Sequence, residues 1–185
     1  MVDLETTGLD PRHDEIVSFA AVPVDAGRIS VGGVVTATIR PTTMPPPETI
    51  RIHGLRPVDL TEAPSLPEVL DRILEALTGR HLVAHAAWIE RGFLDAALRP
   101  IGLRVGKPVL DTAMLARHVT DLEGGQRDQP VRLAVAARRF GLPVHRPHVA
   151  EGDALTTAQL FLALAAHLDL ESEQTVSSLA RLSKA

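Results

Sequence analysis

The chain has 185 residues, of which 45% are hydrophobic and 23% are charged, the size and balance of one globular domain. It contains no cysteine, which excludes disulfides, thiol catalysis and cysteine-ligated zinc or iron–sulfur centres. The net charge of −4 excludes a basic coat for nucleic acid, so any action on nucleic acid needs a local site where metal ions supply the positive charge.

The N-terminal part of the chain is expected to form strands. Residues 15–25 and 29–40 are rich in Val, Ile, Ala and Thr, and the turn residues between them predict a hairpin. Four prolines in residues 41–47 predict a loop. Only two residues precede Asp3, whereas a central strand usually needs ~5–6 residues, so the first strand is expected to be clipped at its N-terminus.

An amphipathic helix is predicted over residues 66–77. Ser65 and Glu68 have the spacing of a capping box, and apolar residues then recur every three to four positions until Gly79.

The second half of the chain alternates a few strand signals with helices. The further predicted elements are a buried strand over 81–84, a helix over about 89–98, a strand at 109–110 leading to Asp111 and another helix, a polar loop over 124–130, a helix over 133–140, a buried helix over 154–168, and a short helix or tail over 171–185. Strands followed by helices with one or two more strands indicate an α/β fold with a mixed sheet.

The chain shows no apolar run long enough to span a membrane and no signal peptide, because its first fifteen residues are rich in acids. A cytoplasmic location, with no membrane partner, is the expectation. We expect one functional domain over residues 1–170, followed by the helix or tail.

Asp3 and Glu5 form the first candidate site. Residues i and i+2 of a strand point to the same face, so two carboxylates stand side by side while Leu4 points into the core. Such a pair repels unless a cation lies between its members, and hard oxygen ligands suit magnesium or manganese. A strand end carrying two solvated acids explains the pair equally well.

Two later segments each carry an acid near a predicted helix start. Glu90 follows the strand over 81–84, and Asp153 follows His148. Pro147 and Gly152 hinder a helix before Asp153, which predicts His148 on a loop and Asp153 near the start of the buried helix. Taken singly, each acid is better explained as complementing a helix dipole.

Taken together and in this order, the three segments resemble a known family. They read D-x-E-T-T-G from Asp3, H-x7-F-L from His85, and H-x-A-x-x-D-A from His148. This pattern is similar to that of the DEDDh 3′–5′ exonucleases, which include the epsilon subunit of bacterial DNA polymerase III, RNase T and oligoribonuclease. Over roughly residues 1–168 the resemblance implies a ribonuclease H-like fold, with a central five-stranded mixed sheet flanked by helices.

The resemblance also implies roles for individual residues. Asp3, Glu5 and Asp153 match three metal-binding acids, Glu90 occupies the position of the remaining one, and His148 matches the general base. The implied cofactors are two Mg²⁺ or Mn²⁺ ions, which would offset the phosphate charge and activate the attacking water. A histidine can take the proton of that water near neutral pH.

Further residues match the family's substrate-binding stretches, and Asp111 matches a supporting aspartate that is not a metal ligand. The expected substrate-binding residues, which would flank the 3′-terminal nucleotide, are Thr6, Thr7, Gly8, Leu9, His53, Gly54, Leu55 and His85.

Two departures from the family pattern keep other functions open. Glu90 stands where the family has Asp, and its extra methylene moves the carboxylate by ~1.5 Å, whereas magnesium demands near-octahedral ligands at ~2.0–2.1 Å. Ala86 stands where the family often has Asn. The first alternative is therefore a degenerate exonuclease domain that binds nucleic acid or a partner without cutting. A weaker alternative is an oligoribonuclease-like phosphodiesterase that prefers dinucleotides.

The expected partners follow from the same resemblance. They are 3′ ends of single-stranded nucleic acid, DNA or RNA, a nucleoside monophosphate product, and a polymerase or another domain. A homodimer is left open, because relatives of RNase T type are dimers.

Trp88, the single tryptophan, could stack on a base, but packing at the strand–helix corner is the favoured interpretation. Arg138 and Arg139 are interpreted as part of a solvated helix face, and Arg146 as a residue that could meet phosphates.

Overall fold

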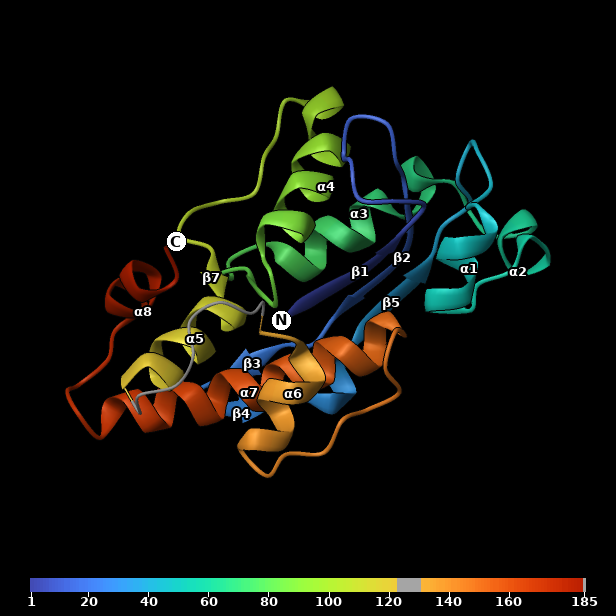
Figure 1. Ribbon diagram of the computed structural model, residues 1–185. Coiled ribbons are helices and arrows are strands. Elements are labelled where there is room, and N and C mark those ends of the chain that lie inside the picture. Colours follow the sequence, from blue (N-terminus) through green and yellow to red (C-terminus); the bar gives the residue numbers. More distant parts are fainter. Residues whose placement is uncertain (123–130, 185) are drawn as a thin grey trace.

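The computed structural model describes residues 1–122 and 131–184, and it arranges helices on both faces of a central set of strands (Figure 1). β1 (Val2–Thr6), β2 (Ile16–Ala21) and β5 (Val35–Thr38) form an antiparallel sheet in the order β1-β2-β5. Along β1 the buried side chains alternate with less buried ones, which places Leu4 in the core as predicted.

The predicted hairpin is present. β3 (Val24–Asp25) pairs with β4 (Arg28–Ile29) across the expected turn, and a 3₁₀ turn, η1 (Val31–Gly33), interrupts the second strand before β5 begins. The end of the predicted proline loop is instead the start of α1 (Pro47–His53), because proline is well tolerated in the first turn of a helix.

Two helices follow α1. α2 (Pro57–Thr61) is short, and α3 (Leu66–Leu77) is the predicted amphipathic helix. Its N-terminus carries the predicted capping interaction, because the Glu68 carboxylate accepts the Ser65 backbone N–H at 2.7 Å and the Ser65 hydroxyl at 2.6 Å.

β6 (Val83–Ala84) and β7 (Leu110–Asp111) form a short parallel pair, and β6 lies next to β1. The single five-stranded mixed sheet that we expected is therefore seen only in part: in the described residues the hydrogen-bonded ladders are separate, β1-β2-β5 and β6-β7. β6 is short because the chain turns away directly after it, at Ala86, which has a left-handed φ of 61°.

Helices cover the strands from two sides. α3 and α4 (Trp88–Leu98) pack on one face of the β1-β2-β5 sheet, where Leu4, Phe19, Ile73 and Phe93 share one apolar core. A 3₁₀ turn, η2 (Arg99–Ile101), follows α4. On the opposite face lies the long helix α7 (Ala150–Asp169), which contacts both β1 and β2 (Figure 1).

The remaining helices pack around α7. α5 (Thr112–Leu122) and α6 (Leu133–Arg139) both contact it, and α8 (Val176–Leu182) packs on α5 and β7 with Leu179 buried. The segment predicted as a helix or tail thus contains α8, while the loop predicted over 124–130 falls outside the described residues. In the part of the chain that the structure describes, no helix combines the length and apolar character needed to cross a membrane.

α7 begins earlier than predicted, at Ala150, so that Gly152 lies within its first turn. A side chain at this position would collide with backbone carbonyl oxygens of the preceding loop: a Cβ atom would contact His145 O and lie 2.7 Å from Arg146 O. Glycine therefore serves here to let the loop approach the helix, rather than to end the helix. The prediction that Gly152 hinders a helix before Asp153 was wrong.

Candidate active site

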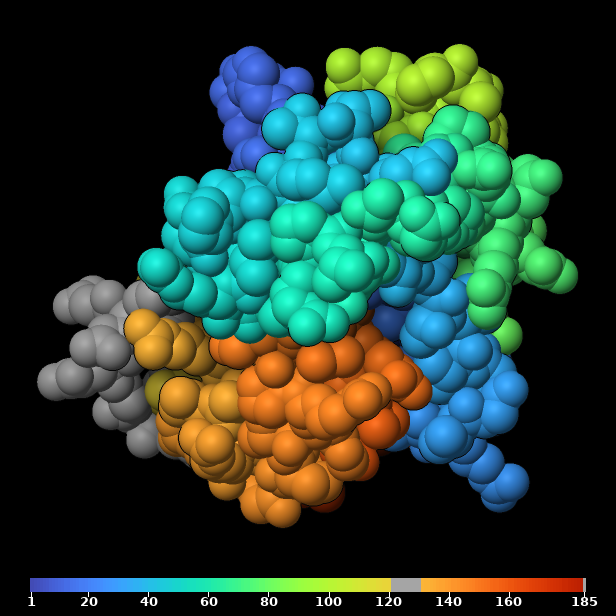
Figure 2. Space-filling model, turned by 90° about the vertical axis from the view of Figure 1, so that its right-hand side faces the viewer, coloured from blue at the N-terminus to red at the C-terminus, as the bar shows by residue number. Residues whose placement is uncertain are grey.

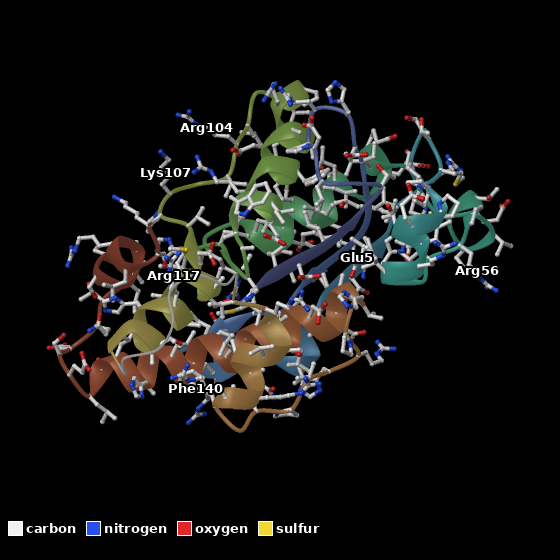
Figure 3. The ribbon with its side chains drawn as sticks, viewed as in Figure 1. Glu5, Arg56, Arg104, Lys107, Arg117 and Phe140 are labelled. Carbon is white, nitrogen blue, oxygen red and sulfur yellow. The ribbon has the colours of Figure 1, made fainter. Side chains whose placement is uncertain are left out.

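The two acids of β1 lie on the strand face opposite Leu4. Figure 3 shows Glu5 on β1, in the space between that strand and α7. α7 contributes Asp153 from its first turn. Ligand oxygens of Asp3, Glu5 and Asp153 all lie within 4.8 Å of one another. The fold therefore brings Asp153 next to two acids that lie about 150 positions earlier in the sequence.

Glu90 lies close enough to interact electrostatically with Asp3 and Glu5. It does not belong to the group whose ligand oxygens all lie within 4.8 Å of one another. It stands in the first turn of α4, is only 5% exposed, and its buried Oε2 has no hydrogen-bond partner in the structure. Burial raises the pKa of the Glu90 carboxyl to about 8. Its charge in turn contributes to the raised pKa of Asp3, second only to burial.

The acids perturb one another strongly. Burial and the charges of Glu90, Glu5 and Asp153 hold the pKa of Asp3 well above its ordinary value. Burial and the charge of Asp153 raise the pKa of Glu5 to about 7. The pKa of Asp153 is also raised by burial, against the stabilising effect of the His148 backbone N–H. Perturbed carboxylates of this kind cluster at functional sites.

The donor set fits divalent metal ions. Every candidate ligand is a carboxylate oxygen, the type that Mg²⁺ and Mn²⁺ prefer. A cation would relieve the mutual repulsion of the acids. It would also give the unpartnered Oε2 of Glu90 a partner, because this oxygen could coordinate the ion or accept a hydrogen bond from a water molecule bound to the ion. Asp3, Glu5, Asp153 and Glu90 are therefore the residues that could hold the metal ions.

His148 lies on the loop before α7, as predicted, and its side chain is exposed. Its backbone N–H donates to Asp153 Oδ2 at 2.9 Å, so the main chain fixes the histidine next to one of the acids. Its φ of 60° is unusual for a residue other than glycine. Strained backbone of this kind is concentrated at functional sites.

Asp111 organises the start of α4 rather than joining the acids. Its carboxylate accepts the backbone N–H groups of Ala86 at 3.1 Å, Ala87 at 2.9 Å and Ala113 at 2.8 Å. These bonds hold the left-handed turn at Ala86 and therefore fix the direction from which Glu90 enters the site. This geometry agrees with a supporting role for Asp111, and only its family position signalled that role in the sequence.

Most of the predicted substrate-binding residues gather near the end of β1. Thr6 and Thr7 are buried, and Thr49 Oγ1 on α1 donates to Thr7 O at 3.2 Å, which ties α1 to this end of the strand. Gly8 packs directly on Asp14, whose Oδ1 accepts the Thr7 hydroxyl at 3.1 Å. No motif in the sequence pointed to Thr49 or Asp14.

His53, Gly54 and Leu55 form a turn at the end of α1. The buried His53 accepts the Leu55 backbone N–H at its Nδ1, 3.0 Å away, which leaves the proton on Nε2. Nε2 is buried and has no partner in the structure, and Gly54 supplies the left-handed φ of 75° that the turn needs. Leu9 is 70% exposed. In Figure 2 the surface of α1 and α2 lies above that of the segment that carries His148 into α7.

Three further residues discussed from the sequence lie outside this group. His85 has both ring nitrogens engaged, Nδ1 with Thr112 Oγ1 at 2.9 Å and Nε2 with Val131 O at 2.7 Å, so substrate binding by His85 stays a prediction that this geometry does not favour. Trp88 is 64% exposed, so the interpretation that it packs at the strand–helix corner was wrong. Arg146 pairs with Glu151 at 2.9 Å.

A hollow of about 980 Å³ lies near the opposite end of β1 and does not contain the acids. The residues that line it include Met1, Leu77 and Arg104. The convergence of perturbed carboxylates therefore indicates the candidate site, whereas this hollow does not.

Comparisons with known proteins identify the family of the chain. A family profile described as Exonuclease matches residues 1–161. The DNA polymerase III subunit epsilon of Treponema pallidum is 33% identical over 166 residues, which cover 89% of this chain and 75% of that protein. A DNA polymerase III subunit epsilon-like protein of Rhodobacter capsulatus is 35% identical over 165 residues, covering 88% of this chain.

Solved structures share the fold. Exonuclease X in complex with 5′-overhanging duplex DNA aligns with a TM-score of 0.76 at 22% identity, covering 99% of this chain and 98% of that one. Exonuclease I of E. coli in complex with a dT13 oligonucleotide aligns with a TM-score of 0.77 at 16% identity, covering 92% of this chain and 41% of that one.

The fold and the acidic site thus define an exonuclease domain, and the matching profile and relatives specify it further. The chain belongs to the DEDDh 3′–5′ exonuclease family, of the RNase T and DNA polymerase III epsilon type. It spans only 23% of the Rhodobacter protein and 11% of a PolC-type DNA polymerase III of Thermotoga maritima.

Proposed function

We propose that this chain is a metal-dependent 3′–5′ exonuclease that hydrolyses phosphodiester bonds at the 3′ end of single-stranded DNA or RNA. The observation that carries the proposal is the convergence of Asp3, Glu5 and Asp153 within 4.8 Å, with the buried Glu90 beside them. Two Mg²⁺ or Mn²⁺ ions held by these acids would supply the positive charge that a phosphodiester needs and would make a water molecule easier to deprotonate.

In this proposal the chain's own residues position the substrate and move the proton. The imidazole of His148 takes the proton of the attacking water, from a loop position fixed by the bond between its backbone N–H and Asp153. The turn formed by His53, Gly54 and Leu55 and the stretch from Thr6 to Leu9 flank the terminal nucleotide. His53 Nε2–H, buried and without a partner in the structure, is available to donate to that nucleotide.

An end-labelled assay tests the reaction. Single-stranded DNA and RNA labelled at the 3′ end are incubated with the protein and Mg²⁺ or Mn²⁺, beside Asp3→Ala and the distant surface variant Leu170→Ala. We expect metal-dependent release of the terminal nucleoside monophosphate by the parent and by Leu170→Ala, and no release by Asp3→Ala. The preferred strand then identifies the sugar that the site accepts.

The proton-transfer role of His148 is tested separately. Replacing His148 by Ala removes the general base and should lower kcat by about 10²–10⁴-fold. The melting temperature and the affinity for Mn²⁺ should stay close to those of the parent, because the side chain is exposed and is not one of the acids. Full activity in a folded His148→Ala variant would remove the histidine from the proposal.

Two alternatives have distinct outcomes in the same assay. A binding module without catalysis is favoured by Glu90 in place of an aspartate, and it would bind single strands without releasing nucleotides; Glu90→Asp should then create activity. A dinucleotide phosphodiesterase would cleave dinucleotides faster than longer strands. The lengths of the relatives add a further proposal, that this exonuclease domain works beside a polymerase or another domain.

A further inference from the structure

Trp88 is a large aromatic side chain that the fold leaves in solvent. It is 64% exposed, whereas Phe19 and Phe93 are at most 2% exposed. It is also the single tryptophan of a chain that has no tyrosine. An exposed apolar residue needs no explanation when it lies far from any site, but Trp88 opens α4, the helix that carries Glu90.

The geometry of α4 fixes the direction of Trp88. Successive residues of a helix are rotated by 100°, so Glu90 is about 200° from Trp88 around the axis. Glu90, Phe93 and Leu94 are buried and face the strands. Trp88 therefore projects from the outer face of α4, while the helix start that it occupies is held at the site through the bonds from Ala86 and Ala87 to Asp111.

The loop between β1 and β2 lies beside α4 (Figure 1). Gly92 is one turn beyond Trp88, and a Cβ atom there would lie 2.9 Å from Pro11 Cγ. Leu9 of the same loop is 70% exposed. The outer side of α4, which carries both Gly92 and Trp88, thus lies next to the loop that begins with the proposed substrate-binding stretch.

We infer that Trp88 is a stacking platform for a base of the single strand, upstream of the terminal nucleotide; this inference rests on the proposed function. An α-helix with its side chains is about 10–12 Å across, so a base that reaches the outer face of α4 cannot belong to the nucleotide bound beside Glu90. A nucleoside monophosphate bound beside Glu90 therefore does not reach Trp88. Because every base has a π face, the contact tolerates any sequence.

The fluorescence of Trp88 can be used to measure this contact. With one tryptophan and no tyrosine, emission excited at tryptophan wavelengths comes from Trp88 alone. The protein is titrated with an unlabelled single-stranded 12-mer, with a 12-mer of the same phosphate count that lacks its bases, and with a nucleoside monophosphate, all in Ca²⁺ without Mg²⁺ or Mn²⁺. We expect quenching of emission by the 12-mer and unchanged emission with the abasic strand and the monophosphate.

Binding is measured independently by the anisotropy of a 5′-labelled 12-mer. Trp88→Ala should weaken binding by about 5- to 150-fold, the range for loss of one stacked base, and Trp88→Phe should recover most of it. Leu170→Ala, which truncates an 86% exposed side chain at the end of α7, is the control and should bind like the parent.

The outcomes separate this inference from the proposed function. If the 12-mer binds, but Trp88 emission is unchanged and Trp88→Ala binds as tightly as the parent, the stacking role is wrong and the exonuclease proposal stands. If the nucleoside monophosphate quenches Trp88 as strongly as the 12-mer, the upstream position is wrong. If no strand binds to the folded parent, both proposals fail.

Discussion

Glu90 is one methylene longer than the family's aspartate, and the structure shows where its carboxylate lies. The side chain reaches the acids from α4 while Asp3 and Glu5 come from β1 and Asp153 from α7. Its carboxylate is buried near the other three acids but lies outside the group whose oxygens are within 4.8 Å of one another. A longer side chain entering from a separate helix can still serve a metal ion, directly or through a water molecule, because its free oxygen already lies in the acidic interior.

Replacing Glu90 by Gln tests this placement. The change keeps the shape and removes the charge, so we expect the affinity for Mn²⁺ at pH 8 to fall by about tenfold or more. Isothermal titration calorimetry measures the affinity without any nucleic acid. Glu75→Gln, the same change at an exposed position of α3, is the matched control. Equal Mn²⁺ affinity in Glu90→Gln and the parent would show that Glu90 does not serve the metal.

At the scale of elements, the start of α7 depends on one close approach. The loop that carries His148 lies so near the helix that the carbonyl oxygens of His145 and Arg146 occupy the space that a side chain at position 152 would need. The neighbours are backbone atoms, which cannot rotate away as a side chain can. The placement of His148 relative to Asp153 is therefore coupled to the absence of a Cβ atom at Gly152.

Gly152→Ala should consequently destabilise the protein. Alanine in a helix normally stabilises it by about 0.5–1 kcal/mol relative to glycine, whereas overpacking costs about 1–3 kcal/mol. We expect the melting temperature to fall by about 2–10 °C in a thermal scan, since 1 kcal/mol corresponds to about 2–4 °C in a protein of this size. Gly32→Ala, where no atom lies within 4 Å of the new Cβ, should change it little. A higher melting temperature for Gly152→Ala would contradict the close approach.

The same elements show what the sequence can and cannot predict. The capping interaction of Ser65 and Glu68 was predictable because it is local, and the juxtaposition of Asp3 and Glu5 because strand periodicity requires it. Gly152 was misinterpreted because a local rule, that glycine weakens helices, was overridden by tertiary packing. The exposure of Trp88 depends on what the rest of the fold leaves uncovered. No local pattern encodes such a property.

At the scale of the whole molecule, three layers meet at the acids. β1, α4 and α7 each contribute carboxylates to one partly buried region, so folding without metal ions brings like charges together. The folded-state pKa values of about 7 for Glu5 and about 8 for Glu90 lie above their ordinary value of 4.5. Between about pH 4.5 and 8 these two carboxyl groups therefore hold more protons in the folded protein than in the unfolded chain, and their contribution to stability decreases as the pH rises through this window.

Thermal scans of the metal-free protein should therefore show a lower melting temperature at pH 8 than at pH 5.5, by an amount on the order of 5 °C. In Glu90→Gln the dependence should be flatter, because one of the raised carboxyl groups is gone, whereas Glu75→Gln should behave like the parent. Mn²⁺ should raise the melting temperature more at pH 8 than at pH 5.5, because a cation binds the charged form of the acids. A melting temperature that rises from pH 5.5 to pH 8 without metal would mean that the folded state does not favour the protonated acids, and that the site is more open to water than its burial indicates.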